Sequence, residues 1–170
     1  MRLKNLFWEI KNNTKFSAII IAIFRFGNFV NKKIHIPIIS QFLFIIYKIL
    51  DWLIIRIICN SEFPPSITIG KRLRVYHPFG MLIQADASIG NDYQMRHQVT
   101  IGWAKSSKNG EGTPNLKNNV DIGAGAKIIG NITIGDNVVV GANSLVCNNV
   151  EANDVVGGVP ARSLKKEIKK

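Results

Sequence analysis

The sequence predicts a parallel β-helix preceded by a helical segment, and three observations carry this prediction. First, an aliphatic residue occupies every sixth position from Leu116 to Val146, whereas helices repeat at about 3.6 residues and half-buried strands at about two. Second, the fifth place of each hexad is small or branched, and the other places are mostly Gly, Asn, Asp and Lys, which suit tight corners. Third, residues 1–59 lack this period and are rich in Ile, Leu and Phe.

The sixfold phase continues upstream of the strict repeat. It passes through Ile69, Val75 and Met81, slips by two residues, and resumes through Ile83, Ile89, Met95 and Ile101. The slip predicts a small bulge at one edge of a triangular coil. Fifteen residues instead of six then separate Ile101 from Leu116, which predicts a loop extruded over residues 103–115. Such an excursion from a rigid scaffold often carries binding residues, although a tolerated insertion also explains it.

Two of the three histidines occupy equivalent places in the repeat. His77 lies two places after Val75 and His97 two places after Met95, while His35 precedes the repeats. Because stacked strands lie about 4.8 Å apart, the two rings should lie close together on one face. A single histidine is more often a surface or structural residue, but two in register beside a loop favour a functional site.

The hexads resemble those of the hexapeptide-repeat acyltransferases. The motifs behind this resemblance are Ile122-Gly-Ala-Gly-Ala-Lys, Ile134-Gly-Asp-Asn-Val-Val, Val140-Gly-Ala-Asn-Ser-Leu and the closing Gly157-Gly-Val-Pro-Ala-Arg. The run from Ile69 to Gly102 resembles the serine acetyltransferase branch, and more closely the colanic acid and capsular polysaccharide acetyltransferases. The resemblance covers residues 60–165. It implies a left-handed β-helix of about four coils, usually a homotrimer, that transfers acetyl from acetyl-CoA to a hydroxyl.

The resemblance also implies catalytic roles. His77 matches the general base of the serine enzymes, and Glu62, fifteen positions earlier, matches the carboxylate that orients it. A base with a pKa near neutrality suits the deprotonation of a hydroxyl. A solvated residue before Pro64-Pro65 is the other interpretation of Glu62. His97 matches a histidine of the polysaccharide enzymes and would hold the acceptor or share the base role.

Acetyl-CoA is the acetyl donor that the resemblance implies, bound in a groove along the prism. There Ala124 and Ala142 would let the pantetheine arm approach the backbone, and Arg162 would face a phosphate. Ordinary coil corners explain the two alanines equally well. Where some relatives have a Thr-Lys pair, this chain has Cys147-Asn148, which puts one family contact in doubt.

The chain departs from the serine acetyltransferase pattern at two places that bear on the acceptor. The family has Asp before the base and an Arg-His-Pro triplet in the loop, where this chain has Tyr76 and Gly112-Thr113-Pro114. A site without those charges has less to hold a zwitterion. We therefore expect the acceptor to be a sugar hydroxyl of surface polysaccharide or its precursors, with serine as the alternative acceptor.

Two further alternatives come from other classes of protein. A γ-type carbonic anhydrase also places histidines on stacked coils, but it needs three histidine ligands and the repeats hold two, so we expect no bound metal. A non-catalytic solenoid used for assembly would transfer acetyl to no acceptor. The net charge of +11 suits nucleic acid, anionic lipid or phosphorylated ligands, and no nucleic-acid module is visible. Cys59 and Cys147 lack paired spacing, which favours free thiols in the cytoplasm.

Residues 1–60 form a predicted helical segment, and residues 61–170 a predicted β-helical acetyltransferase domain. Ser17–Val30 is apolar except at Arg25, and Pro37 opens a second segment, Ile38–Cys59. On the latter, polar residues fall within one arc and leave a wide apolar face; they are Gln41, Lys48, Asp51 and Arg56. Neither segment has about 20 uninterrupted apolar residues, which argues against a membrane span. The apolar face either caps the β-helix or a subunit interface, or lies on the inner membrane surface, and the sequence favours neither.

Overall fold

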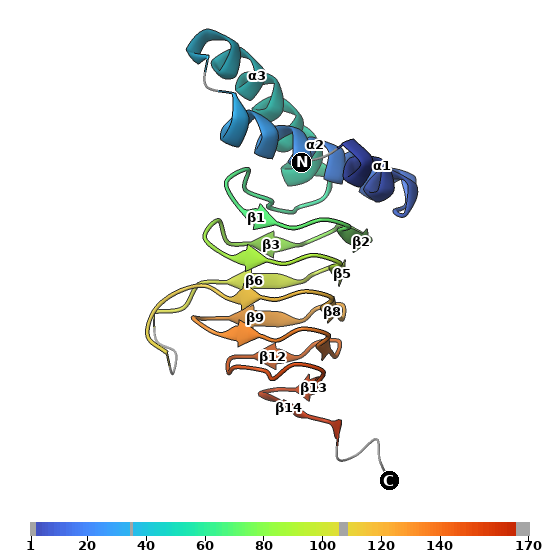
Figure 1. The fold of residues 1–170 in the computed structure, drawn as a ribbon, viewed down its shortest axis with the longest axis vertical. Coiled ribbons are helices and arrows are strands. Elements are labelled where there is room, and N and C mark those ends of the chain that lie inside the picture. Colours follow the sequence, from blue (N-terminus) through green and yellow to red (C-terminus); the bar gives the residue numbers. More distant parts are fainter. Residues whose placement is uncertain (1–2, 35, 106–108, 166–170) are drawn as a thin grey trace.

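The computed structural model describes residues 3–34, 36–105 and 109–165, so His35 and loop residues 106–108 lie outside the described residues. The chain begins with α1 (Leu3–Lys11), α2 (Lys15–Lys33), α3 (Pro37–Leu50) and the π-helix η1 (Asp51–Ile58). These helices sit at one end of a stack of short strands, and the last strands lie at the other end (Figure 1).

The strands wind through three sheets, and each sheet is one face of a prism. The first face holds β1 (Thr68–Ile69), β4 (Ser88–Ile89), β7 (Asn115–Leu116) and β10 (Thr133–Ile134). The second holds β2 (Arg74–Tyr76), β5 (Gln94–Arg96), β8 (Asp121–Ile122), β11 (Val139–Val140), β13 (Val155–Gly158) and β14 (Ala161–Ser163). The third holds β3 (Leu82–Ile83), β6 (Thr100–Gly102), β9 (Lys127–Ile129) and β12 (Leu145–Val146). Neighbouring strands are parallel along the prism, and β13 and β14 close it as an antiparallel pair.

The strand register confirms the predicted solenoid. Ile89 lies beside Ile69 on one side and Leu116 on the other, and Met95 lies between Val75 and Ile122. Each hexad therefore stacks its aliphatic residue on that of the next coil, and these side chains form the buried core. The predicted helical segment before the repeats is confirmed as well.

Asparagine side chains explain one corner of the prism. Asn119, Asn137 and Asn153 stack on successive coils with φ between 54° and 62°, a region that Asn tolerates better than most residues. Asn119 donates a side-chain hydrogen bond to Asn137 (2.8 Å), and Asn137 donates one to Asn153 (2.9 Å). The Asn content of the hexads thus reflects turn geometry rather than chemistry.

The slip between Met81 and Ile83 suggested that the extra residues of the first coil follow Met81. In the structure they precede it. Val75 pairs with Met95, and Ile83 pairs with Ile101. The first coil therefore uses two more residues between these pairs than the second. They enlarge the turn of residues 77–80, and Met81 is a buried counterpart of Val99 rather than the head of a hexad. The insertion thus reshapes the turn that carries His77.

Helix α2 covers the first coil, whose outer strand edge would otherwise lack partners. Asn13, just before α2, donates to the Leu73 carbonyl (3.0 Å) and accepts from the Val75 amide (2.8 Å). Farther along, Asn28 donates to the Ile67 carbonyl (2.9 Å). The ring of Phe24 packs against Phe63, with centroids 6.1 Å apart. The first apolar segment therefore caps the first coil of the β-helix.

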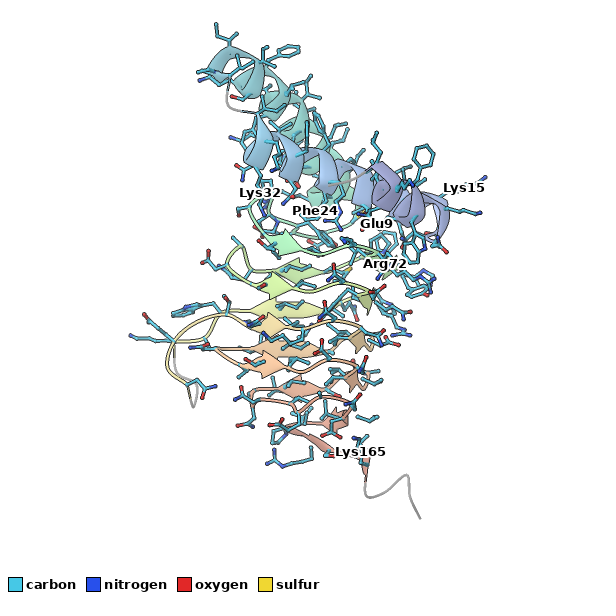
Figure 2. The ribbon with its side chains drawn as sticks, viewed as in Figure 1. Glu9, Lys15, Phe24, Lys32, Arg72 and Lys165 are labelled. Carbon is cyan, nitrogen blue, oxygen red and sulfur yellow. The ribbon has the colours of Figure 1, made fainter. Side chains whose placement is uncertain are left out.

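A buried ion pair fixes this cap to the prism. Glu9 of α1 and Arg25 of α2 are 0% and 6% exposed, and Arg25 Nη2 lies 2.7 Å from Glu9 Oε1. Arg25 also donates to the Ile69 carbonyl (2.8 Å), while Glu9 accepts from the Leu73 amide (3.1 Å). Glu9 lies where the helices meet the first coil (Figure 2). The pair thus joins two helices to the two strands that they cover.

We expect Glu9→Gln to destabilise the protein by about 3–5 kcal/mol, because it leaves the buried guanidinium of Arg25 without its counter-charge. Urea unfolding followed by circular dichroism measures this change. Glu151→Gln is the matched control, since Glu151 is exposed near the other end of the prism. Equal unfolding midpoints for the two variants would contradict the role given to the ion pair.

Candidate active site

A pocket of about 490 Å³ opens at the corner between the faces of β2 and β3. We call this edge, made of residues 77–80, 97–98, 123–125 and 141–143, the histidine corner. The pocket is lined by the end of η1 and by the first two turns of this corner; the residues are Ile58, Cys59, Asn60, His77, Phe79, Gly80, His97 and Gln98. It is the place where the structure brings both repeat histidines together.

The two imidazoles face each other edge to face. Their ring centroids lie 6.2 Å apart at an interplanar angle of 74°, as their equivalent places in the repeat predicted. His77 is exposed and adopts φ 56° in the enlarged turn. His97 is half-buried, and within the described part of the chain its buried Nδ1 has no hydrogen-bond partner. A buried ring nitrogen of this kind requires a partner, and a ligand in the pocket would supply one.

Ala124 and Ala142 continue the same corner below His97. The Gly125 amide donates to the His97 carbonyl (2.9 Å), and the Asn143 amide donates to the Ala124 carbonyl (2.8 Å). These bonds stack the three turns. A Cβ on Gly123 would come within 2.4 Å of the Ala142 amide nitrogen, so the backbones lie in close contact there. The turns below the histidines are therefore closely stacked, and the small side chains of Ala124 and Ala142 suit the close approach of an extended ligand.

An apolar wall borders the histidines on the side of the helical cap. Phe79 belongs to the enlarged turn and stacks on Phe16 of α2 with centroids 5.7 Å apart. Ile58 comes from the end of η1. Burial raises the pKa of the Cys59 thiol, which keeps it protonated and unreactive. Sequence reasoning missed these three lining residues: Ile58 and Cys59 precede the repeats, and the slip after Met81 was the one signal that the turn with Phe79 is enlarged.

Glu62 does not hydrogen-bond to His77 in the described chain. It lines a neighbouring pocket of about 360 Å³ that shares Asn60 and Gly80 with the histidine pocket. There its carboxylate pairs with Arg56 of η1 at 3.3 Å, and Arg56 also pairs with Asp51 at 2.9 Å. The orienting role of Glu62 stays a prediction, and the site gains a cation that the repeat pattern did not indicate.

The loop of residues 103–115 leaves the prism at a different corner from the histidines. It follows β6, at the far side of the face that starts at the histidine corner, and it projects sideways from the prism (Figure 1). Asn109 and Asn131 exchange side-chain to carbonyl hydrogen bonds of 2.9 Å, which hold the loop against its own corner. The expectation of histidines beside this loop is therefore wrong within one chain, because one whole face separates the two corners.

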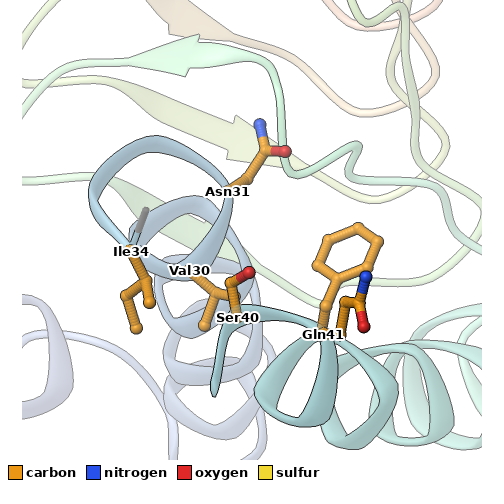
Figure 3. A pocket seen from close by; sticks show the side chains of 6 residues that line it. Val30, Asn31, Ile34, Ser40 and Gln41 are labelled. Carbon is orange, nitrogen blue, oxygen red and sulfur yellow. The ribbon is translucent and has the colours of Figure 1, made fainter. Parts of the chain in front are cut away.

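Arg162 lies near the end of the prism farthest from the helices. It is exposed and lines a pocket of about 250 Å³ together with Cys147 and Asn148. Its predicted contact with a phosphate stays a prediction. Another pocket, of about 200 Å³, lies between α2 and α3 and is lined by residues such as Val30, Asn31 and Gln41 (Figure 3). Among the described residues that line it there is no acid or base, which makes it a weaker candidate for chemistry.

Comparisons with known proteins agree with this geometry. Residues 113–148 match the family described as bacterial transferase hexapeptide (six repeats). Over 112 residues the chain is 38% identical to the serine acetyltransferase of Buchnera aphidicola, a match that covers 66% of this chain and 43% of that enzyme. The chain spans about half the length of the curated relatives that it matches first.

Solved structures give the same result for the fold. Serine acetyltransferase from Brucella abortus, in complex with coenzyme A, is 30% identical with a TM-score of 0.69, and the match covers 85% of this chain and 54% of that one. Soybean serine acetyltransferase complexed with serine is 25% identical with a TM-score of 0.73, over 94% of this chain and 66% of that one. Both likenesses support the expected β-helix of the hexapeptide enzymes.

These comparisons correct the expected acceptor. Relatives at 36–38% identity are named serine acetyltransferases, which contradicts the prediction of a sugar hydroxyl and gives no support to a closer kinship with capsular enzymes. The prediction rested on Tyr76 and Gly112-Thr113-Pro114 alone, and it did not consider charged residues such as Arg56 of η1, which lines the neighbouring pocket. The prediction of an O-acetyltransferase is supported. The chain is thus similar to hexapeptide-repeat transferases, and the relatives and solved structures that it resembles are serine acetyltransferases.

Proposed function

We propose that the chain is an acetyl-CoA-dependent O-acetyltransferase whose acceptor is the hydroxyl of serine. The observation that carries this proposal is the pair of facing imidazoles, His77 and His97, at the head of the corner that continues through Ala124 and Ala142. The similarity to serine acetyltransferases, one of them solved with coenzyme A and another with serine, supports the same conclusion.

The residues of the histidine corner suit acyl transfer to a hydroxyl. Acetyl-CoA supplies the acetyl group as a thioester. His77, the more exposed ring, takes the proton of the serine hydroxyl as the oxygen attacks the thioester carbonyl. The carbon–sulfur bond then breaks, and the same proton passes from His77 to the departing thiolate, which leaves as the CoA thiol. The products are O-acetylserine and CoA, and no other reactant is needed.

The charges that would hold a zwitterionic acceptor lie in the neighbouring pocket. Arg56 offers a guanidinium for the carboxylate of serine, and Glu62 offers a carboxylate for its ammonium group. These two residues would replace the Asp and Arg that the serine enzymes have at the places of Tyr76 and Gly112. Serine would have to open the Arg56–Glu62 pair, whose side chains are 46% and 42% exposed, and solvent-exposed pairs of this kind open at little cost.

Donor binding, self-association and location are part of the same proposal. Ala124 and Ala142 would accommodate the pantetheine arm, and Arg162 a phosphate group. A homotrimer would bring the loop of one copy near the histidine corner of another, since the loop lies on a different edge of its own chain. The thiols of Cys59 and Cys147 are free, which is compatible with the cytoplasm.

The purified protein should release CoA thiol from acetyl-CoA in proportion to added serine. A thiol-reactive dye follows the reaction, and mass spectrometry identifies O-acetylserine. Glycine, which lacks the hydroxyl, is the matched control acceptor and should give only the background rate of hydrolysis. Equal thiol release with glycine and serine would rule out the proposed acceptor.

Glu62→Gln should raise the KM for serine about tenfold with little change in kcat, because the ammonium group loses a charged partner. Steady-state kinetics at saturating acetyl-CoA measure both constants. Asp136→Asn is the control, since Asp136 is exposed between β10 and β11, at a corner that carries neither the histidines nor the loop. A fall in kcat at unchanged KM would instead assign Glu62 the orienting role toward His77.

A further inference from the structure

The helical segment of residues 37–58 exposes apolar side chains where a surface helix usually exposes polar ones. Its outward side, which we call the outer face, consists of large apolar side chains that are 47–82% exposed; they are Ile38, Phe42, Ile45, Ile49, Trp52 and Leu53. Residues 37–58 form one helical stretch whose most apolar window has a mean hydropathy of 1.9, and 17% of that window is buried. By length and composition alone, this stretch is long and apolar enough to cross a membrane, even with its polar residues.

Two polar residues of this helix, Tyr47 and Asp51, point inward instead. Tyr47 and Asp51 are buried, and the Tyr47 hydroxyl donates to the Asp51 carboxylate at 3.2 Å. Arg56 donates to the same carboxylate at 2.9 Å. An ordinary surface helix places its charges outward and its apolar stripe inward. The outer face therefore requires an apolar environment that the described chain does not provide.

The helical cap exposes positive charge only, within the residues that the structure describes. Residues 1–60 contain two acidic residues, Glu9 and Asp51, and both are buried in ion pairs with arginines. The exposed lysines of this region are Lys4, Lys11, Lys15, Lys32, Lys33 and Lys48. Lys15 extends from the end of the helices into solvent (Figure 2). A partner for this region must therefore offer an apolar region to the outer face and negative charge to the surrounding lysines.

We propose that the outer face docks on the surface of a lipid bilayer that carries anionic headgroups. A helix with an apolar face and flanking lysines lies in the interface, with its apolar side chains among the acyl chains and its cations at the headgroups. A second copy of the chain fits less well, because it would bring the same cations together. The inference does not depend on acetyl transfer.

The helix lies flat on the bilayer in this arrangement rather than crossing it. Tyr47 and Ile55 are buried against the protein, 2% and 0% exposed, and insertion across the membrane would carry Asp51 and Arg56 into hydrocarbon at high cost. The helices occupy one end of the prism (Figure 1), so the prism would stand away from the membrane. Ile58, at the end of η1, also lines the histidine pocket, which would then open close to the headgroups.

Cosedimentation of the full chain with vesicles tests this proposal. We expect the protein to pellet with phosphatidylcholine vesicles that contain phosphatidylglycerol, and at least tenfold less with phosphatidylcholine alone or in high salt, because the lysines supply part of the attraction. The double variant Phe42→Ser/Ile49→Ser should bind the mixed vesicles at least tenfold more weakly. The double variant Lys33→Gln/Lys48→Gln should also bind the mixed vesicles more weakly. Its binding to vesicles of phosphatidylcholine alone should equal that of the parent chain.

The control double variant is Trp103→Ser/Val139→Ser, because these two exposed apolar residues lie on the prism and its loop; it should bind like the parent chain. Thermal unfolding by circular dichroism establishes that each variant is folded. Failure of the folded parent chain to bind mixed vesicles would overturn the proposal, as would binding that the outer-face variant leaves unchanged. A dimer in solution that the outer-face variant abolishes, without vesicle binding, would assign the outer face to a second copy and overturn it as well.

Discussion

The backbone register between successive coils is the constraint on which the rest of the structure depends. Each turn of the histidine corner hydrogen-bonds to the turn above it, from Gln98 to Phe79 and from Gly125 to His97. Because the register is fixed by main-chain groups, residues far apart in sequence occupy one straight edge. His97 and Ala124 become neighbours across 27 positions of sequence for this reason. The site is therefore a property of the stacking and not of any single loop.

A solenoid leaves an open strand edge at its first coil, and the chain closes this edge with polar side chains from helices. Asn13, Arg25 and Asn28 supply the hydrogen bonds that another coil would have made. The ion pair between Glu9 and Arg25 makes this closure charged and buried, so it favours one placement of the helices. That placement also positions η1, whose last residues form one wall of the histidine pocket. The helices that cover the first coil thus also determine where one wall of the histidine pocket lies.

The repeats could be predicted from the sequence because a period of six leaves few alternatives. The same period predicted that His77 and His97 meet, and the structure confirms it. The period could not place the two-residue insertion in the His77 turn, since Met81 is buried whether it heads a hexad or precedes a strand. Nor could the period show that the loop of residues 103–115 and the two histidines lie at different corners of the prism. Ion pairs such as Arg56 with Glu62 depend on how a helix outside the repeats docks, and no spacing rule encodes that.

The acceptor illustrates a limit of reasoning from single positions. The absence of the family Asp at Tyr76 suggested an uncharged acceptor, yet charge can be supplied from another element that ends beside the same pocket. Here η1 brings Arg56 toward Glu62, and the curated relatives are serine acetyltransferases. What a site can bind follows from the groups that surround it in space, whichever part of the chain they come from.

The most direct test of the central claim, that the histidine corner is the active site, is the turnover of His77→Ala with serine alongside its affinity for CoA. The account predicts that kcat falls at least about 10²-fold, as expected for the loss of a general base, while the Kd for CoA measured by calorimetry stays within about twofold. Near-normal turnover in a folded His77→Ala protein would contradict the account and move the chemistry away from this residue.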